Sequence, residues 1–333
     1  MPSHNLETTS DFVVSPSPKS LCIELTNECN MNCQHCLYAH GRNKYSIISN
    51  EIINRLKPVI KNADFIGLDG GGEVLLNRQT RDILKNIASF SQIDFTTNGK
   101  NLTQDVIDEL PLESVAGIHI SFDGFANEPW SILRKGNEPI LVFEAFKRIM
   151  KAISARQLRT TVWCNIVLST LNIKELYNSI VRIADLGITR FHCIHLIITH
   201  DELQKYSLFY CPSIYNNEIQ AVKALAEERG LELYTPQLFG QPKLNTGNAW
   251  PYHYQCELPF DHAVIRSNGK VVVCCDPRTE IGDAAKEDFL SIWHSEAYNK
   301  FRSMVNSKHP PKECRECIHP TYINVDNLKY PKI

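Results

Sequence analysis

Three cysteines lie within eight residues near the start of the chain, in the stretch "CNMNCQHC". Cys29, Cys33 and Cys36 have the spacing C-x3-C-x2-C. Cysteine thiolates hold iron–sulfur clusters, and a four-iron cluster normally takes four of them. Three protein ligands leave one iron open, as in a catalytic metal site. The alternative is a closed zinc site, which His35 or His40 would complete.

A second group of cysteines lies in the C-terminal quarter of the chain: Cys256, Cys274, Cys314 and Cys317. Four thiolates can surround a metal or cluster without leaving an open position. The default interpretation of the remaining five is an inert thiol, usually buried: Cys22, Cys164, Cys193, Cys211 and Cys275. Disulfides are not expected, because the chain has the features of a cytoplasmic protein.

Composition excludes several classes of protein. Charged residues make up 22% of the 333 residues and the formal net charge is −2, so no basic surface for nucleic acid or an anionic membrane is expected. The N-terminus lacks the charged start and apolar run of a signal peptide. No apolar run approaches the length of a membrane span, about 18 residues. The sequence therefore predicts a cytoplasmic protein.

Short apolar runs alternate with amphipathic helical patterns over the first two thirds of the chain. Six runs are predicted to be strands: 21–26, 65–71, 93–99, 117–124, 161–169 and 190–197. Helical patterns follow them, the first with Ser49 as its predicted N-cap. Six successive βα units imply a parallel sheet.

The alternation within the strands decides between an open sheet and a barrel. The fourth strand sets one apolar face against one polar face: Ile118, Ile120 and Phe122 against His119, Ser121 and Asp123. A sheet buried between two helix layers is apolar on both faces. A polar inner face instead indicates a partial (β/α)6 TIM-like barrel with helices outside only. Cys164 should then face outward and Cys22 inward.

The pattern changes after the sixth unit. Residues 1–20 are expected to form a flexible tail, 21–240 the barrel, and 241–333 a small cysteine-bearing domain with a C-terminal tail. Within that domain, Asn268-Gly269 predicts a hairpin turn, and residues 289–305 predict one helix.

Three glycine-containing stretches end neighbouring strands: "GGGE" (70–73), "TTNG" (96–99) and "SFDG" (121–124). The carboxyl ends of barrel strands are where enzymes of this architecture place their sites. All three stretches are therefore expected on the same rim as the cysteine loop.

With these motifs in order, the chain resembles the radical S-adenosylmethionine (SAM) enzymes over residues 21 to about 235. The resemblance implies that Cys29, Cys33 and Cys36 hold a [4Fe–4S] cluster whose fourth iron is chelated by SAM. One electron, from a flavodoxin- or ferredoxin-type reductant, then cleaves SAM to a 5′-deoxyadenosyl radical that abstracts a substrate hydrogen. The same resemblance implies contacts to SAM from these residues: Gly71, Gly72, Glu73, Asn98, Ser121, Arg134 and Asn165.

The C-terminal cysteines resemble those of the twitch subtype of the SPASM extension of this family. This implies one auxiliary [4Fe–4S] cluster with four protein ligands: Cys256, Cys274, Cys314 and Cys317. Cys275 is an alternative to Cys274. A zinc site with four cysteines is the alternative for the whole set.

The sequence leaves the substrate open. The leading hypothesis is a maturase of a ribosomally synthesised peptide, which forms a crosslink, epimerises a residue or rearranges the backbone. It would act with a separate leader-recognition protein. The alternative is a dehydrogenase or epimerase of an aminocyclitol- or sugar-like small molecule, and a more distant one is a non-catalytic zinc-binding interaction protein. Cys193 and His195 are the predicted catalytic residues. Cys22 and Cys211 are further candidates for a thiol hydrogen donor.

Overall fold

The computed structural model describes residues 12–38, 44–240, 256–274, 278–315 and 317. It confirms all six predicted barrel strands, which are β1 Ser20–Ile23, β3 Phe65–Leu68, β4 Ile93–Thr97, β5 Val115–Ser121, β7 Thr161–Leu168 and β8 Arg190–His195. These strands pair in parallel in the order β1-β3-β4-β5-β7-β8.

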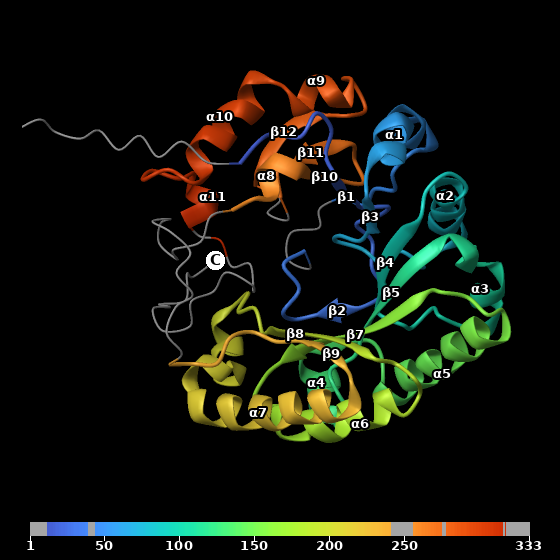
Figure 1. The fold of residues 1–333 in the computed structure, drawn as a ribbon, viewed down its shortest axis with the longest axis vertical. Helices are drawn as coiled ribbons and strands as arrows, with labels where there is room; N and C mark the ends of the chain where they lie inside the picture. The colour runs from blue at the N-terminus through green and yellow to red at the C-terminus, as the bar shows by residue number, and fades with distance from the viewer. Residues whose placement is uncertain (1–11, 39–43, 241–255, 275–277, 316, 318–333) are drawn as a thin grey trace, which may run out of the picture.

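Helices follow the strands as the patterns predicted: α1 Asn50–Asn62, α2 Arg78–Ala88, α3 Gln104–Glu109, α5 Pro139–Ala155, α6 Leu176–Ala184 and α7 Pro212–Arg229. The Ser49 side chain caps α1 by accepting from the backbone N–H of Ile52 at 3.3 Å. A shorter helix, α4 Asn127–Ile132, precedes the two-residue strand β6 Arg134–Lys135. These helices lie along the outer side of the curved sheet (Figure 1).

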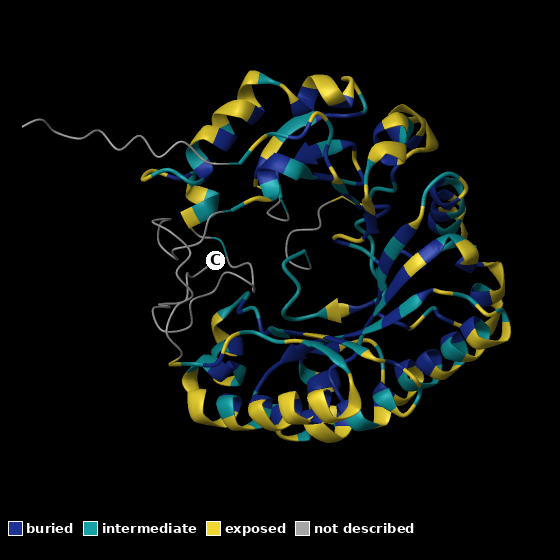
Figure 2. Ribbon diagram, in the orientation of Figure 1, coloured by how far each residue is buried: buried dark blue, intermediate teal, exposed yellow. Residues whose placement is uncertain are grey.

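The inner and outer faces of the sheet differ as predicted. On β5, Ile118 and Ile120 are fully buried, whereas His119 and Ser121 are partly exposed. The outer face packs on the inward sides of the helices, which are buried while their solvent sides are exposed (Figure 2). One polar face confirms the partial TIM-like barrel, and Cys164 lies in the outer core as expected.

The barrel sheet continues at both edges, giving ten strands in all among the described residues. At one edge, β9 Glu232–Tyr234 pairs with β8. At the other, β10 His262–Ile265 pairs in parallel with β1, followed by β11 Lys270–Val272 and β12 Glu280–Asp283. β10 and β11 form the predicted hairpin, with Gly269 at φ +85° in its turn. The C-terminal region is thus built onto the first strand of the barrel.

One helix prediction was wrong in detail. Residues 289–305 form two helices, α9 Phe289–Trp293 and α10 Glu296–Val305, instead of one. Ser295 has extended backbone geometry, and its side chain accepts from the N–H of Tyr298, so it begins a new helix. Two further short helices, α8 Leu258–Asp261 and α11 Lys312–Arg315, complete this region.

The described part of the predicted flexible tail is held in place. Ser15 donates its N–H to the Phe260 carbonyl at 3.0 Å and accepts from the Trp293 indole at 2.8 Å. Lys19 donates to the Asp261 carbonyl at 2.8 Å. Because these bonds are long-range in sequence, the expectation of flexibility does not hold for residues 12–20. The boundary predicted at 240 adjoins residues outside the described part, so the division into domains stays a proposal.

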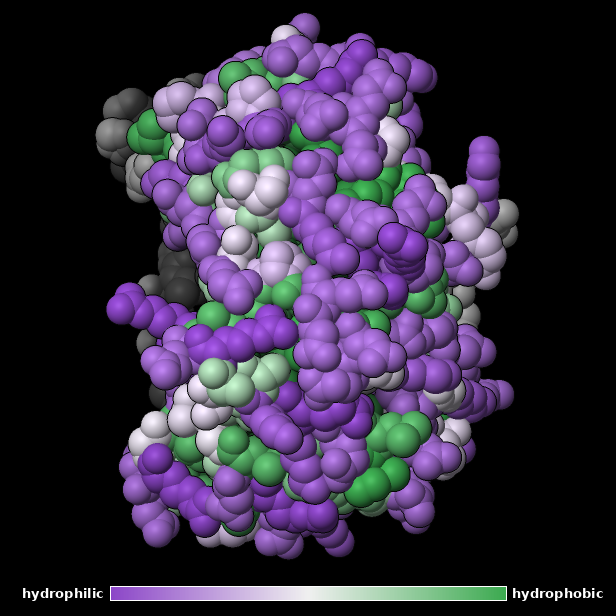
Figure 3. Space-filling view, turned by 90° about the vertical axis from the view of Figure 1, so that its right-hand side faces the viewer, coloured by the Kyte–Doolittle hydropathy of each residue, from purple (hydrophilic) through white to green (hydrophobic). Residues whose placement is uncertain are grey.

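The surface shows no dominant apolar area on the face displayed in Figure 3, where hydrophilic side chains predominate and hydrophobic ones form small separate patches. Among the described helices, none combines the length and apolar character that crossing a bilayer requires.

Candidate functional site

The loop with the three N-terminal cysteines is held by strand pairing. Its short strand β2, Asn32–Cys33, pairs antiparallel with β6, which places Cys33 opposite Arg134. Two more bonds fix the following turn: the Gln34 N–H donates to Leu133 at 2.8 Å, and the Thr199 hydroxyl donates to the Gln34 carbonyl at 2.6 Å. No local sequence pattern indicates these contacts, because the paired segments are far apart in the chain.

Glu73 lies at the carboxyl end of the second barrel strand, and its side chain is only 2% exposed. Its carboxylate accepts from the Thr97 hydroxyl at 2.6 Å and from the Asn98 N–H at 2.8 Å. Burial raises the pKa of Glu73, although its hydrogen bonds to Asn98, Thr97 and Leu75 act in the opposite direction. The carboxylate therefore joins two rim segments, and its predicted contact with SAM stays a prediction.

Asn98 reaches from the rim to the cysteine loop. Its amide nitrogen donates to Asn30 Oδ1 at 2.8 Å and lies 3.8 Å from Cys29 Sγ. Asn30 in turn donates to Asn101 at 3.2 Å. A donor beside a cluster sulfur is one of the features that tune iron–sulfur centres. The structure thus brings Asn98 to the cysteine loop as well as to the rim.

Gly72 has a local structural reason to be glycine. A Cβ at this position would lie 2.3 Å from the Thr26 carbonyl oxygen and 2.5 Å from that of Glu28. The backbone of the glycine stretch therefore lies directly against the segment that enters the cysteine loop.

The fourth and fifth barrel strands carry two predicted SAM contacts on the same face. Ser121 and Asn165 are register partners on β5 and β7 and lie on the inner face. The Oδ1 atom of Asn165 is buried and has no hydrogen-bond partner among the described residues. A buried acceptor without a donor is costly, so a ligand with a donor group fits this position.

Arg134, one of the predicted SAM contacts, is bonded to a protein partner. Its Nε donates to one oxygen of Asp123 and its Nη2 to the other at 3.1 Å, and both side chains are buried. Asp123 also accepts from the Val167 N–H at 2.8 Å. The contact of Arg134 with SAM thus stays a prediction, now in competition with this ion pair.

The chemistry of the three thiols fits a cluster. The pKa of Cys33 is raised to about 11, mainly by burial. The Arg134 charge acts in the opposite direction, and the neighbouring Cys36 and Cys29 add to the increase. These sulfurs are therefore close enough to interact. Among the described residues, no three His, Cys, Asp or Glu side chains converge on a single metal ion.

The four C-terminal cysteines also gather at one place. The pKa of Cys256 is raised to about 12, mainly by burial. A backbone hydrogen bond acts in the opposite direction, and the nearby Cys274 and Cys317 add to the increase. Burial likewise raises the pKa of Cys314, as do the three other thiols. The eleven described cysteines form no disulfide. Cys275, the alternative ligand, lies outside the described residues.

Cys193 and His195, the predicted catalytic pair, lie on the outer side of β8. Cys193 is 2% exposed in the hydrophobic core. His195 is equally buried against Phe209, Tyr215 and Phe239, with ring centroids 4.8, 4.8 and 5.7 Å away. The inner face of β8 instead carries His192. This placement does not support direct contact of either residue with a substrate, so their catalytic role stays an untested prediction.

Comparison with known families agrees with this geometry. The family model of the radical SAM superfamily matches residues 23–192, slightly more than half of the chain. The chain belongs to the radical SAM superfamily. A second model, of the SPASM iron–sulfur cluster-binding domain, matches residues 256–318. This radical SAM protein is therefore an enzyme that uses SAM and [4Fe–4S] clusters.

Proteins similar to this radical SAM enzyme include one sequence relative and two solved structures. It is 26% identical over 319 residues to an AdoMet-dependent heme synthase of Methanosarcina barkeri, covering 87% of this chain and 86% of that protein. Streptococcus suis SuiB bound to SAM has a similar fold, with a TM-score of 0.66 at 15% identity, over 87% of this chain and 69% of SuiB. The enzyme anSMEcpe with AdoMet and the Cp18Cys peptide has a TM-score of 0.62 at 16% identity, over 90% and 86%.

Sequence reasoning missed the residues that hold the site together. The sequence places Asp123 only on the polar face of a strand, and Glu24, within the first predicted strand, has no pattern that marks a structural role. In the structure they are buried, and their carboxylates are bonded to the protein itself. The sequence feature that could have pointed to these two residues is their position on a polar strand face, at the end of a strand.

Proposed function

We propose that this enzyme uses radical SAM chemistry to modify a ribosomally synthesised peptide. Cys29, Cys33 and Cys36 would hold the cluster that binds SAM. When bound, that cluster supplies the electron that cleaves SAM and so provides the radical that removes a substrate hydrogen atom. The four C-terminal cysteines would hold the auxiliary cluster.

The inner wall of the barrel supports a substrate with aromatic or charged groups. His119 stacks on Trp163, with ring centroids 5.3 Å apart and planes within 14°. Tyr234, on β9, continues this wall with its ring centroid 5.8 Å from that of Trp163, and it is 50% exposed. Asp94 lies 3.3 Å from His119, and the Arg190 guanidinium lies 5.1 Å from the Trp163 ring.

The observation that carries the proposal is that this wall runs to an open edge of the sheet. Among the described strands, β9 pairs only with β8, and β12 only with β11, so no strand pairing closes the barrel. A cavity of about 420 Å³, lined in part by Asp94, Trp163 and Arg190, lies at the amino ends of the strands and is therefore separate from the predicted SAM site at their carboxyl ends. An open-sided chamber admits a segment of a longer chain, which a closed one excludes.

Residues on this wall can also handle protons. Partial desolvation and the neighbouring His119 lower the pKa of His192 and so favour its neutral form. A neutral imidazole on the inner face can accept a proton that a substrate loses during oxidation. His119, bonded to Asp94, is held in a fixed orientation beside it.

A second candidate is a small-molecule substrate. The observation favouring it is the relative named a heme synthase, which matches nearly the whole length of this chain.

The deciding experiment measures 5′-deoxyadenosine release by the anaerobic, cluster-loaded enzyme with SAM and dithionite. One arm receives a pooled synthetic peptide library, and the other a pool of sugars, aminocyclitols and porphyrins. We expect stimulation by peptides and, for Trp163→Ala, a roughly tenfold weaker response, the cost of removing one aromatic anchor. Tyr177→Ala, an exposed aromatic on the outer helix α6, is the matched control. Stimulation by the small-molecule pool alone would refute the peptide proposal.

A further inference from the structure

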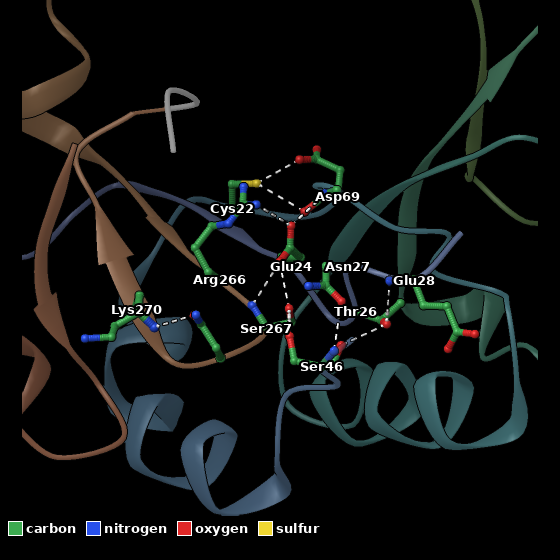
Figure 4. Close-up of polar contacts among 12 residues, drawn as sticks. Cys22, Glu24, Thr26, Asn27, Glu28, Ser46, Asp69, Arg266, Ser267 and Lys270 are labelled. Carbon is green, nitrogen blue, oxygen red and sulfur yellow. Dashed lines mark hydrogen bonds and ion pairs between the residues drawn. The ribbon is translucent and has the colours of Figure 1, made fainter. Parts of the chain in front are cut away.

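Glu24 joins two parts of the molecule that the sequence places far apart. It directly follows β1, and its side chain is 2% exposed. One carboxylate oxygen accepts from the Gly71 N–H at 2.6 Å. The other accepts from the N–H and hydroxyl of Ser267, at 3.1 and 2.7 Å (Figure 4). A single buried carboxylate thus bonds both the glycine stretch of the SAM site and the C-terminal region.

The charge of Glu24 is balanced by an arginine that also contacts the cysteine loop. Arg266 Nη2 lies 3.1 Å from the Glu24 oxygen that accepts from Gly71. The same guanidinium lies 4.6 Å from the ring centroid of Tyr38, two residues after Cys36. Arg266 therefore links the C-terminal region to both the glycine stretch and the cysteine loop.

The glycine stretch is shaped around this carboxylate. A Cβ on Gly70 would lie 2.7 Å from Glu24 Oε2, and one on Gly71 would lie 3.0 Å from it. Gly70 also has φ +150°, a conformation that residues with side chains rarely adopt. The position of the loop predicted to bind SAM consequently depends on where Glu24 lies.

On its other side, Glu24 is bonded to the hairpin that leads to the auxiliary cysteines. Ser267 lies in the turn between β10 and β11, and Cys274 follows β11 by two residues. The Ser267 hydroxyl also lies 2.7 Å from that of Ser46. A shift of the hairpin would thus be transmitted through Glu24 to Gly71.

We propose that Glu24 is a positioning residue that couples the auxiliary-cluster region to the SAM site. The coupling predicts that SAM affinity depends on the C-terminal hairpin, although no residue of that hairpin is among the predicted SAM contacts. This inference rests on the proposed radical SAM site but not on the identity of the substrate.

The test measures the SAM dissociation constant by equilibrium dialysis on the anaerobic, cluster-loaded full chain without substrate. We expect Glu24→Gln and Ser267→Ala each to weaken SAM binding by about tenfold, the scale of one lost hydrogen bond. Lys270→Ala is the matched control, since Lys270 lies on the same hairpin but bonds Glu280 and Asp283. Iron content and thermal unfolding identify variants that fail to fold. Of Glu24→Gln and Ser267→Ala, the serine substitution is the milder one.

A double variant separates coupling from general damage. Cys314→Ala/Cys317→Ala should weaken SAM binding when Glu24 is present and have little further effect in Glu24→Gln, because the connection is already broken. Unchanged affinity in Glu24→Gln with intact clusters, or equal losses in both backgrounds, would overturn the coupling. If the wild-type enzyme itself fails to bind SAM, the proposed function fails instead. Lack of stimulation by peptides would bear on neither result.

Discussion

Arg134 and Asp123 form a buried, two-pronged ion pair directly opposite Cys33 in the strand pairing. A buried pair whose partner is removed leaves an uncompensated charge in the interior, which costs about 3–5 kcal/mol. We therefore expect Arg134→Ala to lower the free energy of unfolding by that amount and to reduce iron retention, because β6 holds the cysteine loop.

Denaturant unfolding and iron analysis check this prediction. Arg229→Ala is the control, since its ion pair with Asp185 at 2.8 Å is solvent-exposed and should contribute less than about 1 kcal/mol. A variant with full stability but lost SAM binding would show that Arg134 contacts SAM, as the sequence predicted.

The three N-terminal cysteines should hold half of the iron. We expect about eight iron atoms per chain in anaerobically purified protein and about four in a Cys29/Cys33/Cys36→Ala variant, because each cluster contains four. Iron, sulfide and zinc analysis measures this, with Cys211→Ala as the control. Zinc with little iron in the wild type would contradict both cluster assignments.

His195 should make the protein less stable in acid. Burial lowers the pKa of His195 to about 4, and neither ring nitrogen is hydrogen-bonded among the described residues. The unfolded chain binds this proton below its ordinary pKa of about 6.5, so stability is complete above that pH and falls as the pH drops toward 4. The contribution lost by pH 5 is about 2 kcal/mol.

His195→Phe removes that proton site while retaining an aromatic ring. The free energy of unfolding should then fall less between pH 7 and pH 5 in the variant than in the wild type. The other buried histidines are common to both proteins and cancel in the comparison. Equal pH dependence would show that His195 is protonated in the folded state.

Cys193→Ala tests the placement of the predicted thiol donor. Because Cys193 is buried in the outer core, we expect the substitution to lower stability by about 1 kcal/mol and to leave product formation, and any solvent deuterium that the product incorporates, unchanged. Cys22 is the better candidate for a donor, since its thiol lies on the inner face and donates to Asp69 at 2.7 Å. Lost turnover in a folded Cys193→Ala protein would restore the original assignment.

The sequence determined the family, the fold class and the two cysteine sets, because these depend on local patterns. Strand alternation separates the inner from the outer face, and the glycine stretches mark the strand ends in chain order. The alternation on β8 is too weak to place Cys193 and His195. Only the tertiary structure shows that they face outward, with Cys193 in the hydrophobic core and His195 packed on Tyr215.

Contacts between distant segments were decided by the tertiary structure alone. Glu24 and Ser267 are 243 positions apart, and they meet only because β10 pairs in parallel with β1. Arg134 meets Asp123 because a short helix returns the chain to the end of β5. No periodicity encodes such pairs, since a carboxylate on a polar face has the same local pattern whether it binds a substrate or holds the protein together.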